Sequence, residues 1–210
     1  MQATELAKLL GDACYVFLAA NFLWGLYCVI MVMRRLKLLS FRNELEQSEF
    51  LNEFQQALRS PQPAAADELC ADNPRALAQL GRVAFANRKL STEHLRQLLG
   101  ELVQRDVLGD LEYRISWVAT VIKSGPLLGL FGTVLGMMAA FGRIGTGEKV
   151  QPSQIADEIS IALICTAMGL ATAIPFSYCL ASLNIRLRRL QDSLGSGLLR
   201  LLDYFRTGGV

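Results

Sequence analysis

Apolar residues gather in three long runs that polar stretches separate. Residues 13–33, 124–142 and 159–185 carry no charged side chain and are 21, 19 and 27 residues long. An α-helix needs about 20 apolar residues to cross a bilayer, and a longer run spans with some tilt or extends beyond the lipid. The pattern therefore predicts an all-α integral membrane protein with three transmembrane helices, at 13–33, 124–142 and 159–185. Asn21, a strongly polar residue inside the first run, is expected to hydrogen-bond to a neighbouring helix.

The long polar stretch, residues 34–123, has a helical pattern of its own. It carries 13 basic and 12 acidic residues, and its apolar positions recur every three to four residues. The two prolines of residues 60–63 predict a break in the first helix of this stretch. Asn73, followed by Pro74, predicts an N-cap and a helix that continues to about Asn87.

Ser91 is expected to cap the last helix of this stretch, with Glu93 in the first turn. Apolar positions continue at helical spacing through Leu102 and Val118. We therefore expect this helix to run on toward the second span and to meet it near Lys123. Residues 34–123 as a whole are predicted to form a helical domain.

Two shorter segments complete the pattern. Residues 143–158 contain glycines and a proline and are expected to form a short loop. Residues 186–210 predict an amphipathic helix. Its apolar positions are Leu187, Leu190, Leu194, Leu198, Leu201 and Phe205. This apolar side is expected to pack either against the chain's own polar helices or against a neighbouring subunit.

Basic residues flank the same side of all three predicted spans. They are Arg34, Arg35, Lys37, Lys123, Arg186, Arg188 and Arg189. Because basic residues favour the cytoplasmic side, segments 34–123 and 186–210 are predicted to be cytoplasmic, with 1–12 and 143–158 outside. A cleaved signal peptide is the alternative for the first run, but it would need its basic residues before the apolar core rather than after it. We therefore expect an uncleaved anchor with the N-terminus outside.

Composition excludes several classes of function. The chain is 52% hydrophobic with a mean hydropathy of +0.31, and its net charge of +2 predicts no nucleic-acid surface. Its five cysteines are odd in number and lack metal-ligand spacing, so they are expected to behave as small hydrophobes. The sequence holds one histidine, His94, and no metalloprotease, nucleophile-elbow or phosphate-loop motif. Neither an enzyme nor a bound metal is expected.

The second run carries glycines in two pairs with four-residue spacing, Gly125 with Gly129 and Gly132 with Gly136. Glycine inside a helix in water costs up to about 1 kcal/mol relative to alanine. In lipid, by contrast, small residues let neighbouring helices approach closely. Thr133 lies among these glycines. The run therefore predicts a packed membrane helix with one hydroxyl that points into protein or into a pore.

Two stretches, GPLLGLFGTVLGMMAAF (125–141) and ISIALICTAMGLATAIP (159–175), resemble the proton-channel subunits of the TolQ, ExbB and MotA superfamily. The resemblance is closest to the TolQ and ExbB branch, because that branch has three spans with the N-terminus outside, whereas the MotA branch has four spans. The motif match covers residues 111–180, and the general layout covers the whole chain.

The resemblance implies an assembly and a partner. Members of the family form a pentameric ring in the bacterial inner membrane, around the single spans of a dimeric ExbD- or TolR-like partner. The partner's span carries an aspartate that takes up and releases protons. The proton motive force thereby energises an envelope transport or force-transducing process. The transported ion would be H⁺, with Na⁺ as the alternative, and no cofactor is implied.

The resemblance also assigns residues. Thr133 and Thr166 would line the proton pathway, where their hydroxyls can donate to the partner's carboxylate. Helix packing at the pore is assigned to Gly129, Gly132, Gly136, Gly169 and Pro175, and the proline is expected to kink the third span. Asp157 and Glu158 are expected at the outer mouth. Many relatives carry a glutamate five residues before the third-span threonine, where this chain has Ile161.

Two alternatives stay open at this point. The hydroxyls of Thr133 and Thr166 can instead bond to backbone carbonyls one turn earlier in their own helices, as threonine often does. The chain can also be a non-conducting membrane scaffold, in which the glycines serve only to assemble the helices.

Overall fold

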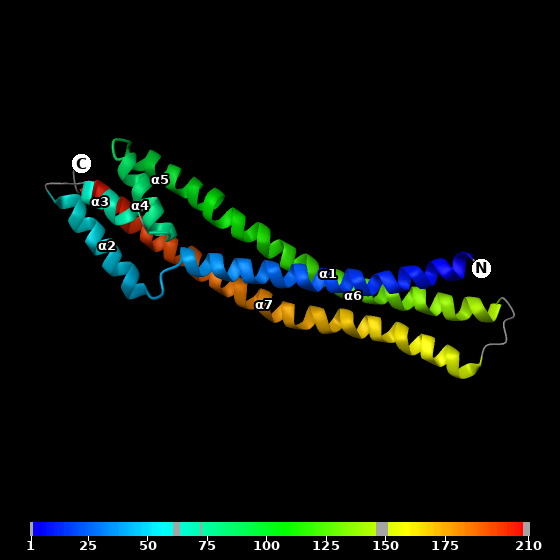
Figure 1. Cartoon of the computed structure of the whole chain (residues 1–210). Coiled ribbons are helices and arrows are strands. Elements are labelled where there is room, and N and C mark those ends of the chain that lie inside the picture. The colour runs from blue at the N-terminus through cyan, green and yellow to red at the C-terminus, as the bar shows by residue number, and fades with distance from the viewer. Residues whose placement is uncertain (1, 61–63, 72, 146–150, 208–210) are drawn as a thin grey trace. The chain divides into compact units, whose positions relative to one another are not determined.

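The computed structural model describes residues 2–60, 64–71, 73–145 and 151–207, and this part of the chain forms helices without any strand. In chain order (Figure 1) the helices are α1 (Gln2–Leu39), α2 (Glu44–Arg59), α3 (Ala64–Ala71), α4 (Ala76–Ala86), α5 (Thr92–Leu102), the π-helical segment η1 (Val103–Leu108), α6 (Gly109–Gly145) and α7 (Pro152–Thr207). The predicted all-α class is confirmed.

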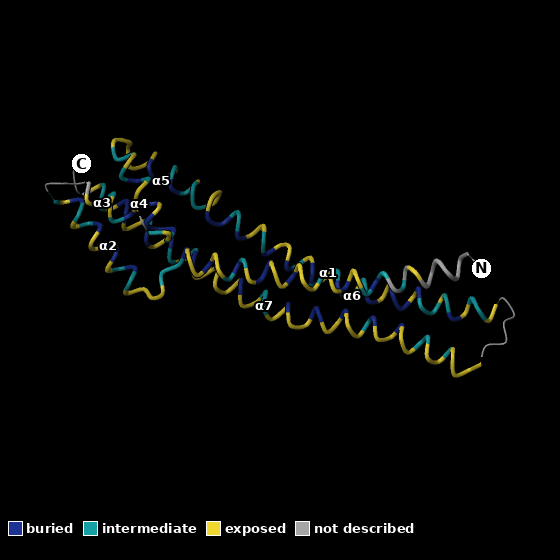
Figure 2. Tube along the Cα trace, viewed as in Figure 1, coloured by how far each residue is buried: buried dark blue, intermediate teal, exposed yellow. Residues whose placement is uncertain are grey.

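Three helical stretches are long and apolar enough to cross a membrane: Ala13–Leu39, Thr92–Gly145 and Pro152–Arg206. They contain the three predicted spans, so the prediction of three spanning helices is confirmed. Figure 2 shows buried and exposed positions alternating along α1, α6 and α7. Each long helix therefore has one side packed within the chain and one side open.

The chain divides into two compact units. The span unit comprises Met1–Ile30 and Ile115–Ser182, and it holds the apolar parts of α1, α6 and α7. Its outward side chains are large and apolar, as Phe17, Leu127 and Tyr178 show with exposures of 59%, 66% and 75%. Such a surface is suited to lipid or to neighbouring membrane helices.

The polar unit comprises Met31–Arg114 and Leu183–Val210. Within it α2, α3, α4 and α5 pack one on the next along the chain. The C-terminal part of α7 contributes a row of buried leucines: Leu183, Leu187, Leu190, Leu194, Leu201 and Leu202. Phe205 lies edge-on to Phe54 of α2. The C-terminal amphipathic helix therefore packs against the chain's own polar helices, and packing against a neighbouring subunit stays a prediction.

Several expected boundaries were correct and others were not. Ser91 is the N-cap of α5, and its side chain accepts from the backbone N–H of His94. Asn73 is not an N-cap, because α4 begins at Ala76 with Arg75 as its cap. The Asn73 side chain instead accepts from the backbone N–H of Arg75 at 3.2 Å, a local turn that delays the helix by two residues.

The expected loop at 143–158 is mostly helix. α6 continues to Gly145 and α7 begins at Pro152, a favoured residue for the first turn of a helix. Residues 146–150, like the predicted break at 61–63, lie outside the described residues. Asp157 and Glu158 therefore lie on a helix rather than in a loop. The prediction also missed α3, a short helix of eight residues.

Candidate functional site

The site lies in the span unit, where α6 and α7 approach so closely that glycine is required on both. A Cβ atom on Gly129 of α6 would lie 2.8 Å from the carbonyl oxygen of Cys165 and 2.9 Å from the Cα of Thr166. A Cβ atom on Gly169 of α7 would lie 2.5 Å from the carbonyl oxygen of Gly125. These separations are shorter than any real carbon contact, so a larger residue would push the two backbones apart.

Two further glycines of α6, Gly132 and Gly136, lie along the same contact. Gly132 faces the Cys165 and Cys14 side chains, and a Cβ atom on Gly136 would lie 2.6 Å from that of Ala162. Pro175 lies inside α7, yet the helix continues without interruption to Thr207, and the proline is exposed. The glycines thus pack α6 on α7, whereas the role of Pro175 in packing at the pore stays a prediction.

Close packing brings two threonines of different helices together. Thr133 of α6 is buried, with 6% of its surface exposed, and Thr166 of α7 is half-buried. Their hydroxyl oxygens are directly hydrogen-bonded to each other. Thr133 Oγ1 also lies 3.1 Å from the carbonyl oxygen of Gly129 and 3.0 Å from that of Ala162. Thr166 Oγ1 lies 3.0 Å from the carbonyl oxygen of Gly129.

This arrangement has fewer protons than acceptors. Each threonine hydroxyl has one proton to donate, whereas its oxygen can accept as well. In one arrangement Thr133 donates to Thr166, which donates to the Gly129 carbonyl. In the other, Thr166 donates to Thr133, which donates to the carbonyl of Ala162 or Gly129. The pair can therefore reverse the direction of its hydrogen bonds by rotating two hydroxyls.

Hydrogen bonds to carbonyls of the same helix, the alternative considered above, account for only part of the threonine contacts. Thr133 does reach the carbonyl one turn earlier in its own helix, that of Gly129. The same carbonyl also accepts from Thr166 of the other helix. Thr172 gives a useful contrast, since its hydroxyl donates to the Met168 carbonyl at 2.6 Å, one turn earlier in its own helix.

A second polar contact lies between α1 and α6 in the same unit. Asn21 donates through Nδ2 to the Val121 carbonyl at 3.3 Å and accepts from the Ser124 hydroxyl at 2.8 Å. The predicted hydrogen bond from Asn21 to a neighbouring helix is confirmed. The contact of Ser124 was not predicted, although a serine at the start of the second run, directly after Lys123, was a signal for a polar contact between helices.

The ends of α6 and α7 are joined by an ion pair between Arg143 and Glu158. Asp157 beside it is exposed. Ile161 has an apolar exposed side chain, and its carbonyl accepts from the Tyr15 hydroxyl at 2.8 Å. Sequence reasoning missed Arg143 and Tyr15. The short connection between two antiparallel helices was a signal for the pairing of Arg143 with an acidic residue.

No group of histidine, cysteine and acidic residues in the described part of the chain is arranged to hold a metal ion. The five cysteines are free thiols, four of them buried, which agrees with their expected role as small hydrophobes. What the site offers is a closely packed pair of hydroxyls in an apolar unit.

Comparison with known proteins identifies the family of this chain. Residues 71–195 match the sequence profile of the MotA/TolQ/ExbB proton channel family. The chain belongs to the MotA/TolQ/ExbB family. Both site threonines lie within the matched residues, as do the glycines of the α6–α7 contact: Gly125, Gly129, Gly132, Gly136 and Gly169. Members of this family are channel and transport subunits rather than enzymes, and this member is a multi-pass membrane protein with three candidate spans.

Individual relatives come from both TolQ and ExbB proteins. The chain is 36% identical over 97 residues to the Tol-Pal system protein TolQ of Haemophilus influenzae, covering 46% of this chain and 41% of that protein. It is 41% identical over 66 residues to the biopolymer transport protein ExbB of Aquifex aeolicus, covering 31% of this chain and 45% of that protein. The alignments thus span less than half the length of each relative.

Proposed function

We propose that the chain is a proton-channel subunit of the bacterial inner membrane that uses the proton motive force to energise an envelope transport or force-transducing process. Its N-terminus and the α6–α7 connection would face the periplasm, with the polar unit in the cytoplasm. It would act as a pentameric ring around an ExbD- or TolR-like partner with a membrane aspartate. Family membership and the TolQ and ExbB relatives support this function.

The single observation that carries the proposal is the hydroxyl pair of Thr133 and Thr166. An ionised carboxylate inside a membrane is costly unless it has hydrogen-bond donors. Threonine hydroxyls supply donors without a fixed charge of their own. Thr166 is the more accessible of the two, so it is the residue that would meet the partner's carboxylate, with Thr133 behind it.

The two hydrogen-bond arrangements would match the two states of that carboxylate. When the carboxylate is ionised, Thr166 donates to it and accepts from Thr133. When the carboxyl group is protonated, it donates to Thr166, which turns its own proton to the Gly129 carbonyl or to Thr133. No proton leaves either threonine, so the pair stabilises both states and lets the carboxyl load and unload.

The driving energy would come from proton entry at the outer side and release to the cytoplasm. Each charge that crosses gains about 2.3 kcal/mol per 100 mV of membrane potential. Loss and gain of charge on the carboxyl changes how the partner helix sits in the ring. Ring and partner would then turn relative to one another, and the partner's outer domain would transmit force.

The test is proton flux in proteoliposomes that hold the chain and the aspartate-bearing partner purified with it. Thr133→Val and Thr166→Val remove a hydroxyl but keep the side-chain volume nearly unchanged. We expect each to lower proton flux at least tenfold and to leave assembly intact, while Thr166→Ser keeps most of the flux. Exchange of Na⁺ for K⁺ in the same assay distinguishes H⁺ from Na⁺ transport.

Thr172→Val is the matched control, because this buried threonine of α7 bonds to its own helix. It should conduct like the wild type. The rival function is a non-conducting scaffold, which the internal hydrogen bonds of the threonine pair would also suit. Wild-type flux in both Thr133→Val and Thr166→Val would end the proposed pore role, whereas a wild type without proton flux would favour the scaffold.

A further inference from the structure

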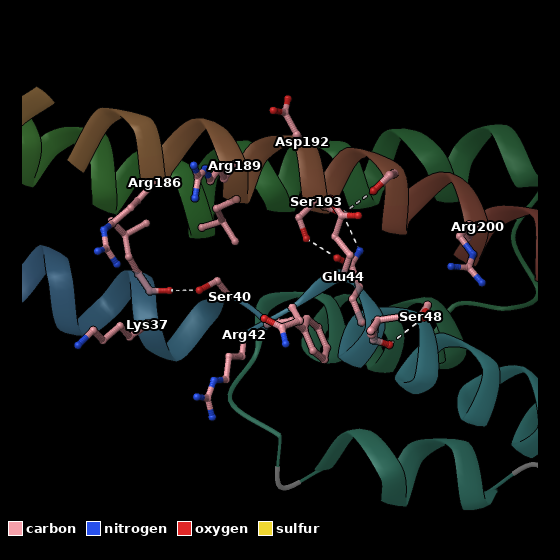
Figure 3. A pocket seen from close by; sticks show the side chains of 17 residues that line it. Lys37, Ser40, Arg42, Glu44, Ser48, Arg186, Arg189, Asp192, Ser193 and Arg200 are labelled. Carbon is pink, nitrogen blue, oxygen red and sulfur yellow. Dashed lines mark hydrogen bonds between the residues drawn. The ribbon is translucent and has the colours of Figure 1, made fainter. Parts of the chain in front are cut away.

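A cavity of about 1110 Å³ lies in the polar unit and shares no lining residue with the threonine pair. Its walls come from three places: the end of α1 from Leu36, the following turn and start of α2, and the part of α7 between Arg186 and Arg200. Figure 3 shows the lining side chains between α7 and the region where α1 ends and α2 begins. The established family role and the proposed function make no use of this cavity.

The cavity is strongly basic. Its lining includes five cationic side chains, which are Lys37, Arg42, Arg186, Arg189 and Arg200, against two acidic ones, Glu44 and Asp192. In Figure 3 Arg186 points from α7 toward the end of α1, whereas Asp192 points away from it. The lining therefore carries an excess of three positive charges.

Among the described residues, none of these five cationic side chains forms an ion pair with an acidic side chain. In the described part of the chain, no carboxylate oxygen lies within 4 Å of a side-chain nitrogen of Lys37, Arg186 or Arg189. Other arginines of the same unit form ion pairs with acidic side chains, as Arg75 does with Glu46. Like charges that share a cavity repel one another, so an anion between them would relieve the repulsion.

The cavity has a fixed wall. Buried Gln47 of α2 donates to the Ser193 carbonyl of α7 at 2.8 Å and accepts from the hydroxyl of the same serine. Gly197 allows this approach, since a Cβ atom there would lie 2.9 Å from the Gln47 amide nitrogen. The serine and the glutamine both line the cavity, so its shape is held by contacts that the cations do not make.

The cavity lies where two candidate spans leave their apolar runs. Lys37 follows the first run by four residues on the continuous helix α1, and Arg186 directly follows the third run on the continuous helix α7. Charged headgroups of a bilayer lie at this level, just beyond the hydrocarbon. Basic pockets between membrane helices at this level bind anionic lipid headgroups.

We propose that this cavity binds the headgroup phosphate of an anionic phospholipid, with Arg186 and Arg189 as its main donors. Arginine suits this task because its planar fork donates two parallel hydrogen bonds to phosphate oxygens. Lys37 adds charge from α1, so the bound lipid would tie the ends of the first and third spans. The proposal rests on membrane placement of α1 and α7 and is independent of proton conduction.

The test is native mass spectrometry of the full-length complex in mild detergent, titrated with dioleoylphosphatidylglycerol and, separately, with zwitterionic dioleoylphosphatidylcholine. We expect tighter binding of phosphatidylglycerol to the wild type. Because R186Q/R189Q removes the two main donors to the phosphate, it should weaken phosphatidylglycerol binding roughly tenfold or more. Binding of phosphatidylcholine should stay the same.

The matched control is R34Q/R188Q, which removes two exposed arginines from the same helices, neither of which lines the cavity. It should bind phosphatidylglycerol like the wild type. Equal weakening in both double variants would overturn the proposal in favour of a diffuse surface charge. A wild type without preference between the two lipids would overturn it as well.

Competition with inorganic phosphate distinguishes a lipid ligand from a soluble anion. Millimolar phosphate should not displace phosphatidylglycerol, because the acyl chains anchor the lipid. Full displacement would overturn the lipid assignment and leave a site for a soluble anion. If R186Q/R189Q fails to assemble, R186Q alone against R188Q gives the same comparison, and proton flux measured on these variants shows whether conduction is a separate property.

Discussion

Helices of the span unit meet through glycine, whereas helices of the polar unit meet through large apolar side chains. In the span unit the closest approaches join Gly129 to the backbone of α7 and Gly169 to that of α6. In the polar unit the buried centre is built from residues such as Phe54, Leu77 and Leu99, each at most 1% exposed.

The difference follows from what surrounds each unit. In water, burying a large side chain stabilises a fold through the hydrophobic effect. In lipid this gain is absent, because the acyl chains are as apolar as leucine, so helices gain by close packing and hydrogen bonds. The polar unit accordingly has ion pairs on its surface, such as Arg82 with Asp67, and the span unit has hydroxyl contacts inside.

The largest effect that this comparison predicts comes from Gly129→Leu. The new side chain would meet the backbone of α7, which cannot move aside without separating the helices. We expect almost complete loss of monodisperse protein in size-exclusion chromatography after detergent extraction. Gly145→Leu on the same helix is the control, since nothing lies within 4 Å of its Cβ position. Normal recovery of Gly129→Leu would show that α6 and α7 do not depend on this contact.

A smaller effect is expected from Phe54→Ala in the polar unit. Phe54 is fully buried against Phe50, Phe205 and Gly81, so its truncation leaves a cavity. Large-to-small changes of this kind cost about 3–5 kcal/mol. Urea unfolding followed by circular dichroism measures the loss, and Leu199→Ala, whose side chain is 59% exposed, should be nearly neutral. Equal losses in the two variants would contradict a core centred on Phe54.

The smallest effect concerns Cys70 in the same core. Burial, and secondarily the charge of Asp67, raises the pKa of its thiol from 9.0 to about 11. The folded state thus holds this proton more tightly than the unfolded chain does, and the stabilisation is lost as pH rises from about 9 to about 11. Between about pH 8 and pH 10, the urea midpoint should therefore fall further for the wild type than for Cys70→Ala. Parallel declines would mean that Cys70 titrates as an exposed thiol.

Much of the fold was predictable because it depends on local pattern. Uncharged runs of sufficient length predict spans, and Ser91 predicts a cap, because each of these rests on residues close in sequence. The start of α4 was wrong by two residues, since a side-chain contact of Asn73 competes with the cap it was expected to make. The end of α6 was predicted too early and the start of α7 too late, because these helices continue beyond their apolar runs.

For the site, the resemblance singled out Thr133 and Thr166, and the structure brings the two together. Spacing along one helix cannot predict that both hydroxyls would share the carbonyl of Gly129. That contact depends on how α6 and α7 are turned toward each other. The basic cavity was missed for the same reason: Lys37 and Arg186 are far apart in sequence, and their charges served only to predict topology.

The π-helical segment η1 has a consequence for the phase of the helix that contains it. Buried positions Leu95, Leu99, Val107 and Leu111 are separated by multiples of four residues. At 3.6 residues per turn, such a spacing would drift steadily around an ordinary helix. The wider turns of η1, with bonds between residues five apart, turn less per residue and cancel part of that drift. A seven-residue repeat counted from α5 into α6 therefore loses its register at η1. The wider turns of η1 accommodate an additional residue, so the buried leucines on both sides of it still face the core.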